Sequence, residues 1–402
     1  MLPARGTPRI ACIEINEDGT TGGSHRALEL LAGGLAGMGF EVVPVFYQEN
    51  RVAERLAAAG FDVRILSALR AHEREVNERG ALPQRLAKAY RAVRERAAFL
   101  KQERIALVHL NNSPFVGFDD WLPASRMLGL PCVVTAMTRQ TPTGRWPLRL
   151  LARRFDALLP CSEYMAGSLR ELGLPPERMQ VVHLGIDIEG FVQSATRTRA
   201  SMRAALGVAP NEFVVLMLGN IRDWKGQDVL LDAVARLPDA LQSRLRVLLA
   251  GEASGADHAY AERLRAQSER LRKPASVSFL GSRNDVADLL SAADVMVHAS
   301  TAPEPFGLVL VEAMAMGVPV VASDTGGPAE IIDAGSGLLV PAGDAAQLAA
   351  TLERLAADQP LCRELSAGGR RRAAAFSADK VARAHAAIYR RLLGEGSVTE
   401  GA

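Results

Sequence analysis

Short apolar runs alternate with amphipathic, helix-like segments along nearly the whole chain. In the first half, strands are predicted by the apolar runs at 9–16, 40–47, 62–66, 105–112, 130–137, 156–162 and 181–187. Several of these runs are apolar at almost every position, which is typical of strands covered on both faces. The segment 24–39 instead repeats leucines at helical spacing, among them Leu28 and Leu35. Strands that alternate with helices predict a parallel sheet.

The alternation pauses at 190–212, a polar segment rich in Ser, Thr and Arg, where we expect a linker. It restarts with predicted strands at 213–220, 245–251, 276–281, 295–300, 318–323 and 337–340. A length of 402 residues also favours two domains over a single core. We therefore predict domains at 1–195 and 196–377, with a C-terminal helix at 378–394 that packs back on the first.

Composition excludes several classes of protein. A hydrophobic content of 48% and a charged content of 23% fit a soluble globular protein. The net charge of +2 gives no overall attraction to nucleic acid, so no nucleic-acid partner is expected. The four cysteines form no CxxC pair, and no cluster of residues predicts a metal site. Neither a signal-peptide pattern nor a membrane span is evident, so we expect a cytoplasmic protein.

Ligand-binding loops are expected at the carboxyl ends of the strands in such folds. Gly22 and Gly23 follow the first strand and precede a helix, where backbone N–H groups approach an anion closely. A tight turn with Ser24 as the helix N-cap is an equal alternative. In the second half, the loop after the strand at 213–220 places Arg222 and Lys225 where two cations suit a pyrophosphate. The alternative there is an ordinary solvated loop.

Residues 300–317, STAPEPFGLVLVEAMAMG, carry the most informative pattern. A helix is predicted to begin near Gly307, because Pro305 tends to precede a helix rather than lie within it. The N–H groups of Phe306, Gly307 and Leu308 then have no partner inside the helix and suit a phosphate.

Two glutamates flank this apolar run. Glu304 lies just outside the predicted helix and suits sugar hydroxyls, whereas Glu312 lies inside it and suits the two hydroxyls of a ribose. A buried carboxylate without a partner is costly, so Glu312 must have one. The alternative is that Glu312 pairs with a core arginine and that Glu304 is merely exposed.

Together these segments resemble the retaining glycosyltransferases of the GT-B fold in family 4, also called group 1. The resemblance covers nearly the whole chain and is strongest over 213–345. Its motifs are the E-x7-E of Glu304 and Glu312 with the following AMAMGVPVVASDTGGPAEII, the loop of Gly219, Lys225 and Gly226, V-x-F-L-G at 277–281, A-D-V at 293–295, and G-x-L-V from Gly337 with Asp344 nearby. The resemblance implies an α/β fold of two doubly wound parallel-sheet, Rossmann-like domains that face a central cleft.

The resemblance also implies residue roles on the donor side. Glu304 contacts the donor sugar and Lys225 stabilises the leaving diphosphate. Arg222 replaces the arginine that the family usually has at the position of Asn220. The donor-binding residues are Gly22, Gly23, Gly219, Asn220, Phe306, Gly307, Leu308 and Glu312. The donor is a nucleotide-diphosphate sugar that serves as co-substrate, and neither a cofactor nor a metal is expected.

The acceptor is expected on the first domain, where His109 and Asn111 are the candidate residues. Many family members have a second histidine where this chain has Asn111, and another where it has Met137. An alternative is that His109 is a core residue, because histidine is intermediate in burial.

Two basic segments of the first domain suggest an anionic membrane as partner. The segment 82–104 places Leu82, Leu86, Val93 and Leu100 on one stripe, with Arg85, Lys88, Arg91, Arg94 and Arg96 on the rest. The segment 139–154 contains Arg139, Arg145, Arg149, Arg153, Arg154 and Trp146 and no acidic residue. Such segments suit the inner face of a membrane and a lipid-linked acceptor. An ordinary solvated helix face is the alternative.

The sequence therefore predicts a retaining, metal-independent hexosyltransferase. Its acceptor would be a glycan or a lipid-linked sugar, in the synthesis of a cell-surface polysaccharide such as lipopolysaccharide, or of a glycolipid. Two alternatives remain open. One is a nucleotide-sugar epimerase or sugar phosphorylase of the same fold, and the other is a catalytically silent partner that binds a sugar nucleotide or a lipid.

Overall fold

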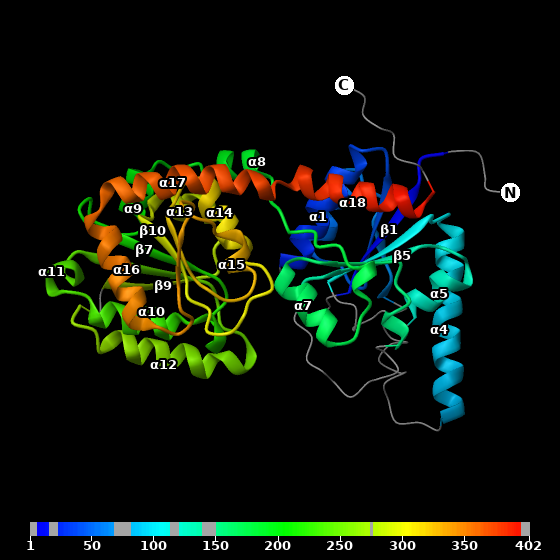
Figure 1. Cartoon of the computed structure of the whole chain (residues 1–402), viewed down its shortest axis with the longest axis horizontal. Helices are drawn as coiled ribbons and strands as arrows, with labels where there is room; N and C mark the ends of the chain where they lie inside the picture. The colour runs from blue at the N-terminus through cyan, green and yellow to red at the C-terminus, as the bar shows by residue number, and fades with distance from the viewer. Residues whose placement is uncertain are drawn as a thin grey trace. The chain divides into compact units, whose positions relative to one another are not determined.

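The computed structural model describes residues 6–15, 23–67, 82–112, 120–138, 150–273 and 276–394. The chain divides into unit 1, Met1–Gly185 with Ala378–Ala402, and unit 2, Ile186–Ser377. In the described residues, each unit contains a six-stranded parallel sheet with helices on both faces (Figure 1). The predicted alternation of strands and helices is confirmed.

The sheet of unit 1 runs in the order β3-β2-β1-β4-β5-β6. Its strands are β1 (Arg9–Glu14), β2 (Glu41–Phe46), β3 (Arg64–Ile65), β4 (Leu107–Asn111), β5 (Cys132–Ala136) and β6 (Ala157–Pro160). The described helices are α1 (Gly23–Ala36), α2 (Arg51–Ala58), α4 (Leu82–Gln102), α5 (Trp121–Met127), α7 (Glu163–Glu171), the short η1 (Pro176–Arg178) and α18 (Ala378–Leu392). Leu28, Leu31 and Leu35 of α1 are buried in the core of unit 1, as the helical spacing predicts.

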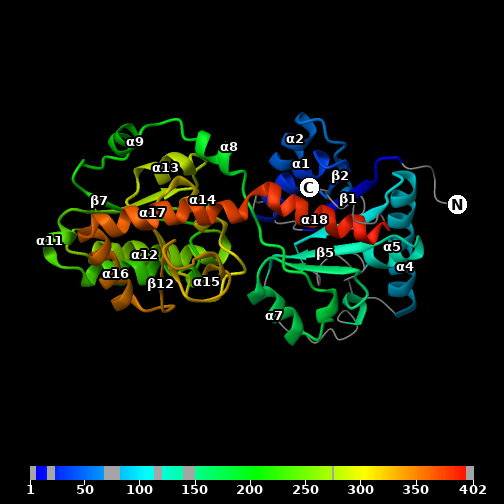
Figure 2. The ribbon, with the colours of Figure 1, turned by 45° about the horizontal axis from the view of Figure 1, so that its top comes forward.

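The last helix of the chain, α18, packs beside α1 within unit 1 (Figures 1 and 2). The two helices are so close at Gly34 that a Cβ there would lie 2.4 Å from Cβ of Ala382. Farther along α18, Ile388 and Tyr389 are buried in the same core as Leu28 of α1. Unit 1 is therefore built from both ends of the chain.

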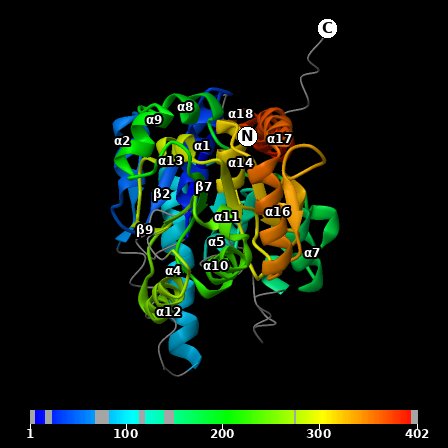
Figure 3. The same ribbon diagram turned by 90° about the vertical axis from the view of Figure 1, so that its left-hand side faces the viewer.

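Unit 2 has the strand order β12-β11-β10-β7-β8-β9. Its strands are β7 (Phe213–Leu218), β8 (Leu245–Ala250), β9 (Val277–Gly281), β10 (Val295–His298), β11 (Val320–Ser323) and β12 (Leu338–Val340). Its described helices are α8 (Ile188–Gln193), α9 (Arg199–Ala205), η2 (Asp223–Lys225), α10 (Gln227–Arg236), α11 (Asp239–Gln242), η3 (Gly255–Asp257), α12 (His258–Glu269), α13 (Val286–Ala292), α14 (Leu308–Met316), α15 (Pro328–Ile331), α16 (Ala345–Ala357), α17 (Gln359–Ala373) and η5 (Ala374–Phe376). On one face α10 packs between α12 and α16 (Figure 3), and on the other α13 packs against α9 and α14.

The expected linker at 190–212 is wrong. This segment contains α8 and α9, and the Asp288 carboxylate accepts hydrogen bonds from the backbone N–H groups of Thr196 and Arg197, at 2.8 Å each. Because these contacts tie the segment to the helices of unit 2, that unit begins at Ile186 and not at the predicted 196.

The strand predicted at 181–187 does not form. The N–H of Val182 donates to the carbonyl of Pro160 at 3.0 Å, and Ile186 makes only an isolated bridge with Ser377. Val182 and Ile186 are buried without a continuous ladder, at the point where the chain passes from unit 1 to unit 2.

In α4, the predicted basic face is wrong at Arg96. Arg96 is fully buried, its Nε lies 2.5 Å from Oδ2 of Asp120, and its guanidinium stacks on Trp121 at 5.4 Å. Arg96 lies one helical turn before the buried Leu100, so it shares the apolar stripe and its charge is met by Asp120. Leu86, predicted on that stripe, is 61% exposed.

Candidate functional site

Four side chains meet in unit 2, where β10 ends and the loop after β7 returns to the sheet. Nζ of Lys225 lies 2.8 Å from each carboxylate oxygen of Glu304. Nε2 of His298, the last residue of β10, lies 2.6 Å from Oε2 of Glu304. The hydroxyl of Ser300 donates to the same oxygen at 3.2 Å. These distances make one hydrogen-bond network centred on the Glu304 carboxylate.

The network keeps Glu304 ionised. Burial by itself would raise the pKa of Glu304, but the attraction of His298 and Lys225 and their hydrogen bonds outweigh it and hold the pKa below its ordinary value. The ammonium of Lys225 also lies 4.3 Å from the ring centre of Trp224. The alternative that Glu304 is merely exposed is excluded, because its side chain is only 15% exposed.

A glycine lets the lysine loop lie against β10. Gly226 has a φ of 77°, and a Cβ on it would lie 1.9 Å from the carbonyl oxygen of Ala299. The N–H of Thr301 donates to the carbonyl of Trp224 at 2.8 Å, which holds the two segments together. The lysine and the glycine after it are therefore needed together, because the glycine permits the approach that brings Lys225 to Glu304.

A second close approach fixes the backbone of Glu304. The N–H of Gly327 donates to the Glu304 carbonyl at 2.8 Å, and Gly326 pairs with Glu304 in an isolated bridge. A Cβ on Gly326 would lie 2.4 Å from that carbonyl oxygen, and one on Gly327 would lie 2.4 Å from Cα of Phe306. The two glycines in DTGGP thus hold the loop that carries Glu304.

The predicted helix start after Glu304 is confirmed. Gly307 is the N-cap of α14, with a φ of 111°, and Leu308 is its first residue. The first N–H groups of a helix have no partner within it, so they suit an anion. Phe306 is buried edge-on against Phe376 at 5.7 Å. Glu312 lies one turn into α14 and is 4% exposed, which places a second carboxylate behind the helix N-terminus.

The other predicted donor-side residues lie near this network without joining it. Gly219 follows β7 with a φ of 139°, and a Cβ on it would lie 4.0 Å from Cε of Lys225. The exposed Asn220 accepts a hydrogen bond at its carbonyl from Gln227 at 3.1 Å. Arg222 is 42% exposed, and its Nε lies 3.8 Å from a carboxylate oxygen of Asp257.

Asn111 of unit 1 connects three elements at the carboxyl ends of the strands. Its amide nitrogen donates to Oε2 of Glu14 at 2.6 Å and to the carbonyl of Ser24 at 2.9 Å. These bonds join the ends of β1 and β4 to the first turn of α1. Gly23 is the first residue of α1, and Gly22 lies outside the described residues.

His109 is a core residue, as the alternative interpretation held. It is fully buried, its Nε2 lies 2.5 Å from Oγ1 of Thr135, and its Nδ1 lies 2.6 Å from the hydroxyl of Tyr389. Burial, followed by the neighbouring His385, lowers the pKa of His109 well below its ordinary value. With both ring nitrogens engaged, His109 does not line the pocket that Asn111 and Met137 line.

Comparison with known proteins agrees with both halves of this description. The sequence model described as "Glycosyl transferases group 1" matches residues 198–372, and the one described as "Glycosyltransferase Family 4" matches 21–189. The chain belongs to the group 1 glycosyltransferases. The network around Glu304 lies inside the first match, and Asn111 and His109 lie inside the second.

Curated relatives of this group 1 glycosyltransferase are named D-inositol 3-phosphate glycosyltransferase. One from Streptomyces bingchenggensis is 35% identical over 71% of this chain and 61% of its own length. One from Mycobacterium sp. (strain KMS) is 40% identical over 51% of this chain and 46% of its own. The matches thus span about half to three fifths of the length of these relatives.

Solved structures confirm the GT-B fold of this group 1 glycosyltransferase. The Anabaena protein HepE, in complex with UDP and glucose, has a TM-score of 0.76 and 25% identity, covering 94% of this chain and 98% of its own. A glycosyltransferase from Rickettsia africae has a TM-score of 0.81 at 18% identity, covering 98% of this chain and all of its own (100%).

Sequence reasoning missed two polar residues of this group 1 glycosyltransferase. His298 and Glu14 each stand at the carboxyl end of a buried strand, where one polar residue interrupts an apolar run. That interruption was the available signal, because the carboxyl ends of parallel strands are where ligand-binding residues gather.

Three predictions remain, on a metal site, on a membrane span and on the basic segment 139–154. Among the described residues, no group of three or more His, Cys, Asp or Glu side chains is placed to hold a metal ion. No helix in the described part has both the length and the apolar composition that a membrane crossing needs. Of the basic segment 139–154, residues 139–149 lie outside the described residues, among them Arg139, Arg145, Trp146 and Arg149.

Proposed function

We propose that this group 1 glycosyltransferase is a retaining, metal-independent hexosyltransferase that uses a nucleotide-diphosphate sugar. The observation that carries the proposal is the network of Lys225, His298 and Glu304 beside the N-terminus of α14. It puts a cation, a carboxylate and helix N–H groups together, which is what a diphosphate joined to a sugar requires. The complexes of HepE with UDP and with UDP-glucose support this class of donor.

In the proposed reaction, the donor separates the pair that Lys225 and Glu304 form in the free protein. Lys225 turns to the diphosphate and stabilises the charge that develops as the bond from the anomeric carbon to phosphate breaks. Glu304 accepts hydrogen bonds from the sugar. The acceptor oxygen bonds to the anomeric carbon on the face that the diphosphate leaves, and the acceptor proton passes to the leaving phosphate oxygen.

The remaining donor contacts follow from the helix N-terminus. The N–H groups of Phe306, Gly307 and Leu308 hold the diphosphate, and Glu312 binds the ribose. The backbone at Gly219 and Asn220 completes the proposed donor contacts of unit 2. Arg222 adds a second cation once the diphosphate displaces Asp257. The ion pair between Arg222 and Asp257 is weak, because it is 3.8 Å long and partly exposed.

For the acceptor we propose a glycan or a lipid-linked sugar in cell-surface polysaccharide, lipopolysaccharide or glycolipid synthesis, reached from the cytoplasmic face of the membrane. The first half of α4 supports an anionic membrane partner. Leu86 and Tyr90 are 61% and 60% exposed there, in the same stretch as the exposed Arg91 and Arg94. Apolar and basic side chains together suit an anionic lipid surface.

Vesicle sedimentation tests the membrane partner. The protein should pellet with vesicles containing phosphatidylglycerol at low salt, and Leu86→Glu should weaken this. Leu339→Glu is the control, because Leu339 is 41% exposed on β12 of unit 2, outside both basic segments. Equal pelleting of the two variants, or none of the wild type, contradicts the membrane partner and leaves the transferase reaction untouched.

Slow donor hydrolysis tests the reaction itself. The protein is incubated with UDP-glucose and other common α-linked nucleotide sugars, and the released sugar is followed by proton NMR. The α anomer should appear first, EDTA should not change the rate, and Glu304→Gln should abolish release. Release of the β anomer contradicts retention. Donor binding without release from any donor indicates a silent partner instead.

A further inference from the structure

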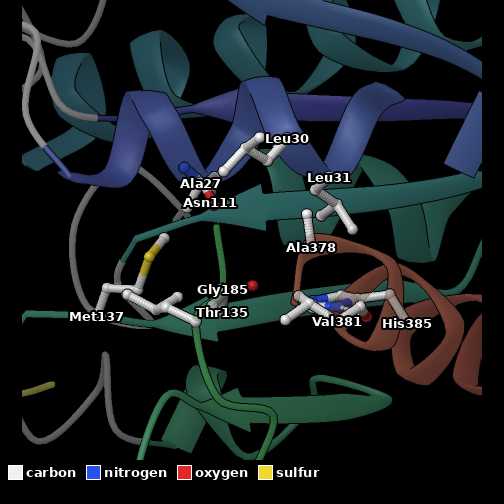
Figure 4. Close-up of a pocket in the computed structure, with 11 residues that line it drawn as sticks. Ala27, Leu30, Leu31, Asn111, Thr135, Met137, Gly185, Ala378, Val381 and His385 are labelled. Carbon is white, nitrogen blue, oxygen red and sulfur yellow. Dashed lines mark hydrogen bonds between the residues drawn. The ribbon is translucent and has the colours of Figure 1, made fainter. Parts of the chain in front are cut away.

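A pocket in unit 1 lies between α1, α18 and the carboxyl ends of β4 and β5 (Figure 4). Its empty space amounts to about 350 Å³, a figure that includes space open to solvent. Leu30 and Leu31 face it from α1, and Val381 and His385 face it from α18. Asn111, Thr135 and Met137 supply the side toward the sheet. The residues that the sequence marked as replacements for histidines, Asn111 and Met137, therefore share this pocket with a histidine from the far end of the chain.

His385 has one ring nitrogen with no hydrogen bond. It is 3% exposed, its Nδ1 lies 2.9 Å from the carbonyl oxygen of Val381, and its Nε2 has no hydrogen-bond partner among the described residues. A carbonyl only accepts, so Nδ1 carries the proton and Nε2 presents a lone pair. Burial lowers the pKa of His385 to about 4, so the ring is neutral at pH 7.

The neighbouring histidine differs from His385 in this respect. His109 stacks on His385 at 5.5 Å and is equally buried, yet Thr135 and Tyr389 satisfy both of its nitrogens. A buried acceptor without a donor costs stability. The unsatisfied Nε2 is therefore best explained by a ligand that brings the missing donor.

We propose that this pocket binds an uncharged, mainly apolar alcohol, whose hydroxyl donates to Nε2 of His385 and whose carbon skeleton packs on Leu30, Leu31 and Val381. The inference deepens the proposed function, because the acceptor is expected on unit 1 and carries the hydroxyl that is to be glycosylated. It assigns to the acceptor an apolar alcohol portion.

The lining of the pocket favours this class over a phosphorylated polyol. None of the described lining residues is an arginine, lysine, aspartate or glutamate. A phosphate needs cations or several N–H donors, whereas here the orphan atom is an acceptor. A polyol needs many polar partners to replace water, and most of the lining side chains are apolar.

Binding measured without any donor sugar tests the proposal. The full chain, labelled with ¹⁵N-histidine, is titrated with cyclohexanol, with its methyl ether methoxycyclohexane, and with inositol 3-phosphate. Cyclohexanol should move the Nε2 resonance of His385 upfield, as expected when a lone pair accepts a hydrogen bond. The ether lacks the donor and should bind at least about tenfold more weakly, the loss expected for one buried hydrogen bond. Inositol 3-phosphate should leave the resonance in place.

Two variants and a matched control complete the test. His385→Phe should lower cyclohexanol affinity about tenfold, and His385→Gln, which keeps an acceptor oxygen, should lose less. His258→Phe is the control, because His258 is exposed and its Nδ1 also contacts a backbone carbonyl, that of Gly255 at 2.8 Å. If the His385→Phe variant does not fold, the comparison of cyclohexanol with methoxycyclohexane on the wild-type protein still tests the proposal.

Equal binding of alcohol and ether, no binding of either, or a response to inositol 3-phosphate alone would overturn the proposal. Because no donor is present, these outcomes do not depend on whether the protein transfers a sugar. An inactive protein that binds cyclohexanol through His385 contradicts only the proposed reaction, and an active one that does not bind it contradicts only the pocket.

Discussion

In unit 2 the partly buried carboxylate of Glu304 has three partner residues, whereas in unit 1 Nε2 of the buried His385 has none among the described residues. The first arrangement is ionic and complete without a ligand, so a ligand must exchange with partners already there. The second is neutral and incomplete, so a ligand adds to it. A charged donor and an uncharged acceptor group suit these two environments in that order.

The largest expected effect comes from removing the charge at the centre of the unit 2 network. Glu304→Gln should lower donor hydrolysis about a thousandfold, because a charged contact to the sugar and the anchor of Lys225 are lost together. Glu212→Gln is the control, since Glu212 is also a buried carboxylate of unit 2 and pairs with Lys273 at 3.1 Å. Equal losses in both variants would make Glu304 a purely structural residue.

The difference in melting temperature between the wild type and Glu304→Gln should depend on pH. The pKa of Glu304 lies below its ordinary value in the folded protein, so the unfolded chain takes up this proton first as pH falls. The stabilisation is therefore present above the ordinary value of 4.5 and is lost below it. The melting temperature of the wild type should exceed that of Glu304→Gln most at pH 7, and the gap should narrow on acidification. A gap that widens in acid contradicts the depressed pKa.

The next effect tests Arg96, a fully buried arginine of unit 1. Arg96→Met should lower the free energy of unfolding by about 3 kcal/mol, because Asp120 then loses its buried cation. Arg94→Met on the same helix is the control, because Arg94 is exposed, and it should change stability by less than about 0.5 kcal/mol. Urea unfolding followed by circular dichroism measures both. Similar free energies of unfolding for the two variants would mean that the pair of Arg96 and Asp120 does not stabilise unit 1.

A smaller effect is expected from the lysine. Lys225→Ala should lower donor hydrolysis about a hundredfold, as expected for one charged group that stabilises a leaving group. Lys273→Ala removes a comparable ion pair with Glu212 elsewhere in unit 2 and should leave hydrolysis near the wild-type rate. A loss with Lys273→Ala as large as that with Lys225→Ala would mean that stability, and not the leaving group, sets the rate.

The smallest effect concerns the histidine that orients Glu304. His298→Leu should lower hydrolysis about tenfold, because one hydrogen bond to the carboxylate is lost. His298→Gln, whose amide can reach Oε2, should recover part of the activity. The loss should appear mainly in kcat. The acidic limb of the pH profile should also move to higher pH, because His298 helps to hold the pKa of Glu304 low. Equal activity of the His298→Leu and His298→Gln variants would mean that His298 only fills space.

The sequence predicted the start of α14 between Glu304 and Glu312 well because the pattern is local. Glu304, Gly307 and Glu312 lie within one turn-and-helix segment, so their spacing alone indicates a helix N-terminus between two carboxylates. Lys225 was marked by the glycine that follows it. His298 was not, because one polar residue at a strand end does not reveal its partner.

The surroundings of His109 and His385 in unit 1 were predicted less well because their contacts join distant segments. His109 meets Tyr389 across 280 positions in sequence, and no local pattern predicts that both nitrogens of one histidine are satisfied while the next has a free lone pair. The periodicity of α4 did place Arg96 on the stripe of Leu100. The charge of Arg96 instead predicted an exposed position, and the sequence does not reveal that Asp120 pairs with this charge inside the protein.

The packing of α18 on unit 1 has a consequence for the order in which the chain folds during synthesis. Domains generally fold as they leave the ribosome, N-terminal first. Unit 1 lacks Ala382, His385 and Tyr389 until the last helix has been translated, so its core and its pocket remain incomplete while unit 2 already has its whole sequence. A chain truncated before Ala378 keeps the whole of unit 2 but lacks α18, so unit 2 should fold in it while the core of unit 1 stays incomplete.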